Sequence, residues 1–172
     1  MKFPLLILIC GGSGSGKSYF AQYFQNAAVL STDDFYVGKS KMTPPYNFDV
    51  PEAFDFDALE LAVQDLLAGK SVEIPVFEPA VSERVGKKRV EPAKYILVEG
   101  IFAFHSALLR DQAALKFFLD VPASERIRRR IERDTCKGRD CAATLQYSIA
   151  VEAEHQRWVE PQKQWADVIV SG

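Results

Sequence analysis

The chain has 172 residues, of which 48% are hydrophobic and 26% are charged, as in an ordinary globular protein that can bury one core. Its formal net charge of −2 argues against a nucleic-acid-binding protein, because no excess of Lys and Arg is present to neutralise phosphates. The apolar run that ends at Cys10 is too short to cross a membrane, and Ile9 stands where a leader would need a small residue. The three cysteines have no zinc-type spacing, so a reduced, cytoplasmic protein is expected. From length and charge, we expect a single domain over residues 1–172 that binds neither membrane nor nucleic acid.

Short apolar runs alternate with helical patterns along the chain, which favours an α/β domain with a mainly parallel sheet. The expected strands cover residues 5–10, 29–31, 95–99, 116–120 and 168–170. The expected helices cover residues 17–26, 57–68, 123–134 and 142–158, and the proline-containing stretch 37–56 is expected to be an ordered loop. The pattern predicts a three-layer α/β/α phosphate-loop fold around a parallel sheet of about five strands.

The segment GGSGSGKS at residues 11–18 follows the first apolar run and matches Gly-x-x-x-x-Gly-Lys-Ser at each fixed position. Its glycines allow backbone N–H groups to surround a polyphosphate, while Lys17 contacts the β and γ phosphates and the Ser18 hydroxyl binds Mg²⁺. A glycine-rich linker is the alternative, but a linker rarely combines the Lys-Ser ending with a preceding strand. The segment therefore predicts a nucleoside triphosphate site with Mg²⁺, formed by Gly11, Gly12, Ser13, Gly14, Ser15, Gly16, Lys17, Ser18 and Tyr19.

Acidic residues follow the second and third expected strands, at the sheet edge where ligands of such folds bind. Asp33 is a candidate to accept a proton from an attacking hydroxyl or to help hold Mg²⁺, whereas Asp34 is expected to cap a turn or helix. Glu99 ends an apolar strand and is a candidate for the Mg²⁺ hydration shell. The predicted metal site is thus Ser18, Glu99 and Asp33.

Residues 123–146 are rich in arginine around a Gly-containing break and are expected to form a helical lid. Arg126, Arg130 and Arg133 are four and three residues apart, so they share one helix face. A solvated charged face and a nucleic-acid patch are the alternatives. Phosphoryl transfer needs cations around the migrating group, and a lid that closes keeps water away from it. Arg130 and Arg133 are therefore expected to act in catalysis with Lys17 and Asp33.

Eight blocks of sequence resemble, in this order, the uridine kinase family of phosphate-loop kinases. They are GGSGSGKS (11–18), DDFY (33–36), NFDVPEAFD (47–55), ILVEGI (96–101), RRIERD (129–134), KGRD (137–140), QY (146–147) and ADVIV (166–170). The resemblance extends over nearly the whole chain. It implies transfer of a phosphoryl group from ATP, with Mg²⁺, to the ribose 5′-hydroxyl of uridine or cytidine, and a tendency to form homo-oligomers.

The resemblance also implies roles for individual residues. Asp33 is implied to be the general base, and Lys137 and Arg139 are implied to join the lid cations that bind the nucleotide. Asp49 is implied to bind ribose hydroxyls. The full implied set for the acceptor is Asp33, Tyr36, Phe48, Asp49, Phe77, Arg130 and Gln146.

Residues 75–82 depart from the family pattern for reading a pyrimidine, which is Pro-x-Tyr-Asp-Phe followed by a His. Phe77 lacks the tyrosine hydroxyl, and Ser82 stands where the His is expected. A site that specifies a base by hydrogen bonds loses discrimination when those groups are absent. The acceptor is accordingly either a pyrimidine nucleoside or another hydroxylated metabolite, such as nicotinamide riboside, a sugar or a hydroxy acid. A nucleotide-binding regulatory protein without an acceptor is the alternative from another class.

Overall fold

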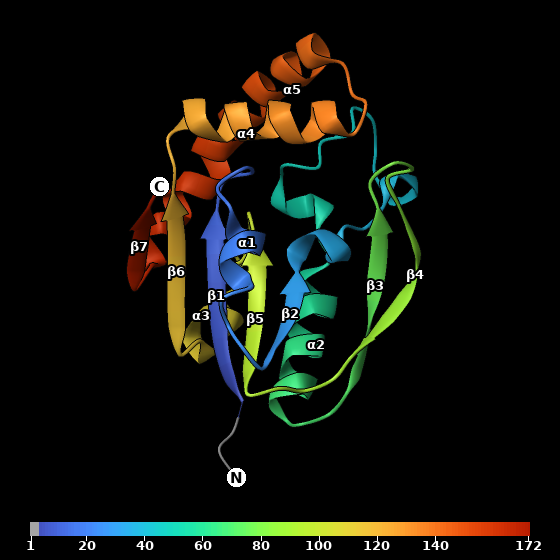
Figure 1. Cartoon of the computed structure of the whole chain (residues 1–172). Helices are drawn as coiled ribbons and strands as arrows, with labels where there is room; N and C mark the ends of the chain where they lie inside the picture. The colour runs from blue at the N-terminus through green and yellow to red at the C-terminus, as the bar shows by residue number, and fades with distance from the viewer. Residues whose placement is uncertain (1–3) are drawn as a thin grey trace.

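A five-stranded parallel sheet forms the centre of the computed structural model, which describes residues 4–172 (Figure 1). In the order β2-β5-β1-β6-β7, its strands are β2 (Ala27–Ser31), β5 (Tyr95–Gly100), β1 (Leu5–Gly11), β6 (Leu115–Asp120) and β7 (Val168–Ser171). Each neighbouring pair is parallel, and the predicted parallel sheet is confirmed. Because β2, β5 and β1 are neighbours, the segments that follow their carboxyl ends meet at one edge of the sheet.

The side chains of β1 point alternately into two separate cores. Leu6 and Leu8 belong to the larger core, which also contains apolar residues of α2 (Phe56–Leu67) and α3 (Ala107–Gln112). Ile7 and Ile9 pack on the other face, where α1 (Lys17–Ala21) contributes Ala21. Burial on both faces explains why the strand is a continuous apolar run, and it confirms the three-layer arrangement.

The first helix is shorter than the 17–26 predicted, because the chain tightens soon after Ala21. The backbone N–H groups of Gln22, Tyr23 and Phe24 donate to carbonyls three residues earlier, rather than four. Asn26 then adopts a left-handed conformation with φ 56°, which turns the chain into β2. The aromatic residues Phe20, Tyr23 and Phe24 keep a helical spacing, and this spacing continues beyond Ala21, where the α-helix ends.

A β-hairpin that the sequence did not predict lies beside β2 (Figure 1). Its strands, β3 (Val72–Glu78) and β4 (Glu83–Val90), form a separate two-stranded antiparallel sheet. Strand β4 reads Glu-Arg-Val-Gly-Lys-Lys-Arg-Val and is exposed along most of its length, so it carries no apolar period. In β3, Pro75 and the exposed residues Glu73 and Glu78 weaken the strand signal.

Arg84 of β4 attaches this hairpin to η1 (Thr32–Phe35), the 3₁₀ turn that follows β2. Its Nε donates to the carbonyl oxygen of Tyr36 at 2.7 Å. Its Nη2 lies 3.1 Å both from the carbonyl oxygen of Phe35 and from Oδ2 of Asp55. One side chain thus satisfies three acceptors in two segments, and one of these acceptors is the carboxylate that caps α2.

Replacing Arg84 with Met is expected to lower the free energy of unfolding by about 2 kcal/mol, because hydrogen bonds from a charged donor are lost while partly buried acceptors remain. The matched control is Arg89→Met on the same strand, whose guanidinium pairs with Glu91 at the exposed surface. That variant should change stability by less than about 1 kcal/mol. Urea denaturation of both proteins tests the difference, and equal midpoints would contradict the anchoring role of Arg84.

Two helices lie across the carboxyl edge of the sheet (Figure 1). They are α4 (Ala123–Cys136) and α5 (Cys141–Glu154), joined by residues 137–140. The helix expected over 142–158 changes at its end into a π-helical turn, His155–Val159, followed by a 3₁₀ turn, Glu160–Trp165. The loop 37–56 contains two further 3₁₀ turns, Lys39–Lys41 and Pro51–Ala53. Among the described residues, none of the helices has the length and apolar character needed to cross a membrane.

Candidate active site

The phosphate loop begins at the end of β1 and curls back on itself beneath α4. Gly14 and Gly16 have φ angles of 84° and 91°, in the region that favours glycine. A Cβ atom at Gly14 would lie 2.6 Å from the carbonyl oxygen of Arg126, so the helix closes directly on the loop. The Lys17 amine is buried and donates to the carbonyl oxygen of Gly12 at 2.9 Å. The loop is therefore held between the sheet and α4 with its lysine folded inward.

Arg126 supports this loop instead of facing a ligand. It is buried, donates to the carbonyl oxygen of Val121 at 2.7 Å and pairs with Glu152 of α5. A Cβ atom at Gly12 would lie 2.7 Å from its Nε and 2.8 Å from Nδ1 of His155. Arg126 and His155 thus pack behind the phosphate loop and connect it to both helices.

A cavity of about 330 Å³, which we call the nucleotide cavity, opens in front of the loop. Ser18 Oγ donates to Oε1 of Glu99 there at 3.1 Å. Mg²⁺ prefers oxygen ligands and usually keeps several waters and substrate phosphates, so one hydroxyl and one or two carboxylates fit it. The cavity is lined by Ser13, Gly14, Gly16, Lys17, Ser18, Tyr19, Ser31, Asp33, Glu99, Gly100, Ile101, Arg129 and Arg133.

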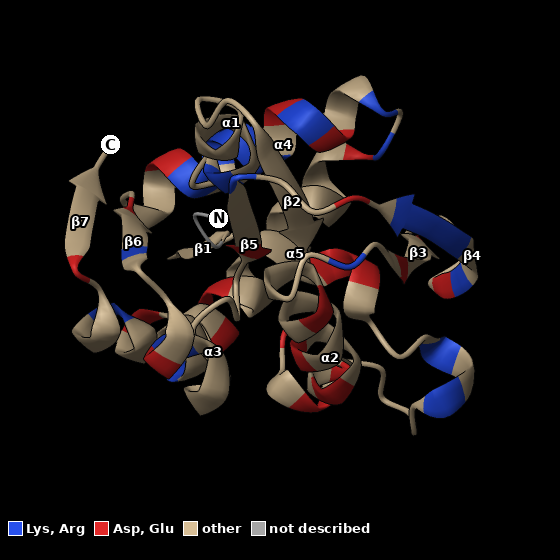
Figure 2. Cartoon of the chain, turned by 90° about the horizontal axis from the view of Figure 1, so that it is seen from below, with Lys and Arg blue, Asp and Glu red and all other residues tan. Residues whose placement is uncertain are grey.

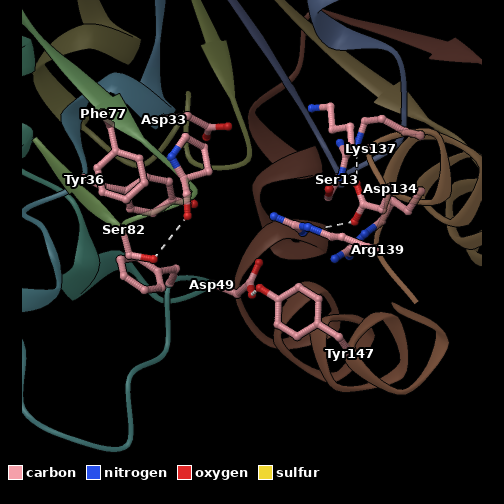
Figure 3. Close-up of a pocket in the computed structure, with 14 residues that line it drawn as sticks. Ser13, Asp33, Tyr36, Asp49, Phe77, Ser82, Asp134, Lys137, Arg139 and Tyr147 are labelled. Atoms are coloured by element: carbon pink, nitrogen blue, oxygen red, sulfur yellow. Dashed lines mark hydrogen bonds and ion pairs between the residues drawn. The ribbon is translucent and has the colours of Figure 1, made fainter. Parts of the chain in front are cut away.

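A second cavity of about 390 Å³, the acceptor cavity (Figure 3), adjoins the first. The two share Ser13, Asp33 and Arg133, so Asp33 lies where they meet. The acceptor cavity is lined by Ser13, Asp33, Tyr36, Phe48, Asp49, Phe77, Pro79, Ser82, Arg130, Arg133, Asp134, Lys137, Arg139 and Tyr147. A ligand in each cavity would thus approach the other at Asp33.

Restricted hydration raises the pKa of Asp33 to about 6, and the nearby carboxylate of Glu99 adds to the increase. The Asp33 side chain opens toward solvent in the cleft, but protein surrounds it on its other sides. Lys17 opposes the shift, and burial in turn lowers the pKa of Lys17. A carboxylate with this pKa is ionised at neutral pH and is still basic enough to accept a proton.

The rate of an Asp33-dependent reaction should consequently depend on pH. Only the ionised carboxylate can accept a proton, so kcat/KM should be constant above a pKa of about 6 and fall tenfold for each pH unit well below it. A pH–rate profile of the wild-type protein at saturating ATP and Mg²⁺ measures this. A flat profile between pH 5 and pH 8, spanning the region of this pKa, would exclude Asp33 as the base.

Asp34 does not cap a turn as predicted. Its carboxylate pairs with Lys88 of β4 at 2.6 Å, whereas the Ser31 hydroxyl accepts the N–H of Asp33 and caps the turn. Successive residues in this tight turn point in different directions, and the hairpin that binds Asp34 was itself not predicted. Asp33 therefore faces the two cavities while Asp34 faces the hairpin.

Three aromatic rings form one wall of the acceptor cavity. The ring of Tyr36 lies 4.9 Å from that of Phe77 and 5.3 Å from that of Phe48, centre to centre. These residues come from three segments: the end of η1, strand β3 and the loop 46–50, which we call the acceptor loop. Ser82 also lines the cavity, but its hydroxyl donates to the carbonyl oxygen of Pro79 at 3.4 Å (Figure 3). This wall therefore offers mainly ring faces to a ligand.

The opposite wall carries charge from α4 and from the turn that follows it, and α5 adds Tyr147. Basic and acidic residues alternate along α4 (Figure 2), and Asp134 pairs with both Arg133 and Arg139. Lys137 and Arg139, expected beside the nucleotide, line the acceptor cavity and are absent from the lining of the nucleotide cavity. Burial lowers the pKa of Arg130, which lies over the Tyr147 ring at 5.3 Å.

Most other residues expected at the site line one of the two cavities. The exceptions in the phosphate loop are Gly11, Gly12 and Ser15, which lie on its inner side. Gln146 is exposed and lines neither cavity, because α5 turns the next residue, Tyr147, toward the acceptor. Tyr147 and Arg129 are two of the lining residues that the sequence did not single out. Both lie in blocks that resemble the family, QY and RRIERD. Membership of such a block was the sequence feature from which a place at the site could have been predicted.

Comparison with known proteins agrees with this geometry. The family model for the phosphoribulokinase/uridine kinase family matches residues 32–172. A uridine kinase from Chloroflexus aurantiacus is 36% identical over 99% of this chain and 88% of its own length. Uridine-cytidine kinase A from Dictyostelium discoideum is 37% identical over 99% of this chain and 36% of its own length.

Solved structures share the fold at lower sequence identity. D-glycerate 3-kinase from Cryptococcus neoformans superimposes with a TM-score of 0.72 at 15% identity, covering 99% of this chain and 87% of that one. Phosphoribulokinase from Rhodobacter spheroides gives 0.67 at 14%, covering 99% and 70%. The fold, the phosphate loop and the match over most of the chain agree, and the chain belongs to the phosphoribulokinase/uridine kinase family.

Proposed function

We propose that this protein is an ATP-dependent nucleoside kinase that phosphorylates the 5′-hydroxyl of a pyrimidine nucleoside. The observation that carries the proposal is the position of Asp33 at the junction of the two cavities. A phosphoryl group that moves from one cavity to the other must pass this carboxylate. The uridine kinases among the relatives, similar over nearly the whole chain, support a nucleoside as the acceptor.

In this proposal the phosphate loop binds the β and γ phosphates of ATP through its backbone N–H groups and Lys17. Bound Mg²⁺ would be held by Ser18 and Glu99, with Asp33 nearby, and would neutralise phosphate charge. Asp33 accepts the proton of the attacking 5′-hydroxyl. Arg129 and Arg133, at the nucleotide cavity, stabilise the charge that spreads over the transferred group.

The acceptor cavity suits the two ends of a nucleoside. The aromatic wall formed by Tyr36, Phe48 and Phe77 provides faces on which a base can stack, and Asp49 provides a carboxylate for ribose hydroxyls. We further propose that residues 123–146 close over both ligands as a lid and shield them from water, since α4 contributes to both cavities and α5 contributes Tyr147 to the acceptor cavity. The ATP requirement and the free thiols of Cys10, Cys136 and Cys141 agree with a cytoplasmic enzyme.

The test is ADP release from ATP and Mg²⁺ with a panel of acceptors: uridine, cytidine, purine nucleosides, nicotinamide riboside, sugars and small hydroxy acids. Stimulation by uridine or cytidine, with a 5′-monophosphate as product, is the expected result. Stimulation by another member of the panel alone would retain a kinase and overturn the pyrimidine assignment. ATP binding without stimulation by any acceptor would favour a regulatory protein.

A further inference from the structure

Helix α5 is connected to the acceptor loop by two hydrogen bonds. Tyr147 Oη donates to Oδ2 of Asp49 at 3.1 Å, and Asn47 Nδ2 donates to Oε1 of Glu154 at 3.0 Å. Tyr147 and Glu154 are seven residues apart, so they lie on the same face of the helix two turns apart. Within the loop, Asn47 Oδ1 accepts the backbone N–H of Asp49 at 2.9 Å. The helix thus holds Asp49 directly through Tyr147 and indirectly through Glu154 and Asn47.

Tyr147 also contacts the buried arginine of α4. The guanidinium of Arg130 lies 5.3 Å from the centre of the Tyr147 ring, a distance at which the ring face attracts a cation. Arg130 is only 5% exposed, and its Nε has no hydrogen-bond partner among residues 4–172. The ring therefore provides part of the environment that keeps this cation at the acceptor cavity. Figure 3 shows Tyr147 and Asp49 pointing toward one another at its edge.

The hydrogen bond from Tyr147 leaves Asp49 free to bind a ligand as well. A carboxylate has about four lone-pair sites, and the tyrosine uses one of them on Oδ2. Burial raises the pKa of Asp49, while the Tyr147 hydroxyl and the charge of Arg130 oppose that change. The tyrosine thus fixes the carboxylate in one orientation and favours its ionised form, which is the better acceptor for two hydroxyl groups.

We propose that Tyr147 is a positioning residue of the acceptor site, which orients Asp49 with its hydroxyl and supports Arg130 with its ring. The inference rests on the proposed function, in which Asp49 binds the hydroxyl groups of the acceptor. It assigns to α5 a direct effect on acceptor affinity. Tyr147 lines only the acceptor cavity of the two, so the effect should be specific to that ligand.

Steady-state kinetics of Tyr147→Phe test the proposal. Loss of a hydrogen bond to a charged group should raise KM for the acceptor about tenfold, while kcat and KM for ATP stay within about twofold of wild type. Tyr147→Leu, which removes the ring as well, should raise the acceptor KM further. In an Asp49→Ala background the Tyr147→Phe change should add little, because the carboxylate it orients is absent. Tyr95→Phe is the matched control, because Tyr95 begins β5 at the end of the strand away from the cavities. This variant should leave kcat and both KM values unchanged.

Hydrogen exchange of the ligand-free protein provides a readout that does not depend on activity. Tyr147→Phe should accelerate exchange in the acceptor loop, including the amide of Asp49, and leave β1 and β5 unchanged. If the wild-type protein turns over no nucleoside, the proposed function fails while this measurement still tests the contact. An unchanged acceptor KM together with unchanged exchange would overturn the role of Tyr147. A parallel fall of kcat, ATP affinity and melting temperature would also overturn it, in favour of a general structural role.

Discussion

The Asp33→Asn protein should bind ATP normally and transfer phosphoryl groups about a thousandfold more slowly than the wild type, because removal of a general base usually costs about 10²–10⁴-fold. The amide keeps the shape of the side chain but cannot accept the hydroxyl proton. Asp33 lies at the junction of the two cavities, so its loss affects the reacting groups and spares the phosphate loop. The measurement is kcat from ADP release at saturating ATP, together with ATP affinity by calorimetry.

The matched control for this variant is Asp34→Asn. Asp34 is the adjacent residue, but its carboxylate pairs with Lys88 of the hairpin at 2.6 Å. We expect that variant to retain most of the activity. Equal losses in the two variants would show that the charge of the turn matters and that neither carboxylate acts as the base.

The melting temperature of Asp33→Asn should show whether this variant is inactive because the base is absent or because the fold is damaged. The folded protein raises the pKa of Asp33 from 3.8 to about 6, so the ionised side chain opposes folding above that pH and does not do so below pH 3.8. Asp33→Asn should therefore melt at a higher temperature than the wild type at pH 8, with a smaller difference at pH 4. An inactive variant with a lower melting temperature at pH 8 would indicate damage to the fold.

Lys17→Met should reduce kcat by about 10²–10³-fold, the usual cost of removing one fixed donor from developing charge in a site shielded from water. The Lys17 amine is buried, and although burial lowers its pKa, the carboxylates of Glu99 and Asp33 favour its charged form. Methionine fills a similar volume without the charge, so the phosphate loop should keep its shape. Single-turnover measurements with bound ATP would separate slower transfer from weaker binding.

An exposed lysine distant from the loop is the control for this second variant. Lys70 follows the end of α2, pairs with Asp65 of that helix and is largely solvent-exposed. Lys70→Met should have wild-type kinetics. If Lys17→Met had them too, the interpretation of residues 11–18 as the phosphate-binding loop would be wrong.

The sequence was sufficient to predict the chemistry at the sheet edge because that chemistry depends on strand ends. Asp33 follows β2 and Glu99 lies near the end of β5, and these two strands proved to be neighbours, with β1 on the other side of β5. The position of the basic residues was less predictable. Helical spacing gave the shared face of Arg126 and Arg130, but the packing of Arg126 behind the phosphate loop depends on tertiary contacts with α5.

The hairpin and Tyr147 show where sequence reasoning fails in physical terms. Strand β4 buries little apolar surface, so its stability depends on pairing with β3 and on the Arg84 contacts, which are distant in sequence. Tyr147 and Gln146 are adjacent on one helix, and only the rotation of α5 determines which of them faces the cavity. Successive side chains of a helix point in directions about 100° apart, and the sequence does not tell which of them faces a cavity until the neighbouring elements are placed.

The hairpin has a consequence for how acceptor preference can diverge among such kinases. It forms a sheet of its own, and its turn, residues 79–82, contributes Pro79 and Ser82 to the acceptor cavity alone. Arg84 and Lys88 attach its strand β4 to the turn that carries Asp33. We therefore expect substitutions at Pro79 and Ser82 to change which acceptor is used more than they change the rate of phosphoryl transfer. In engineering terms, this tip is the place to vary when kinases for other alcohols are sought.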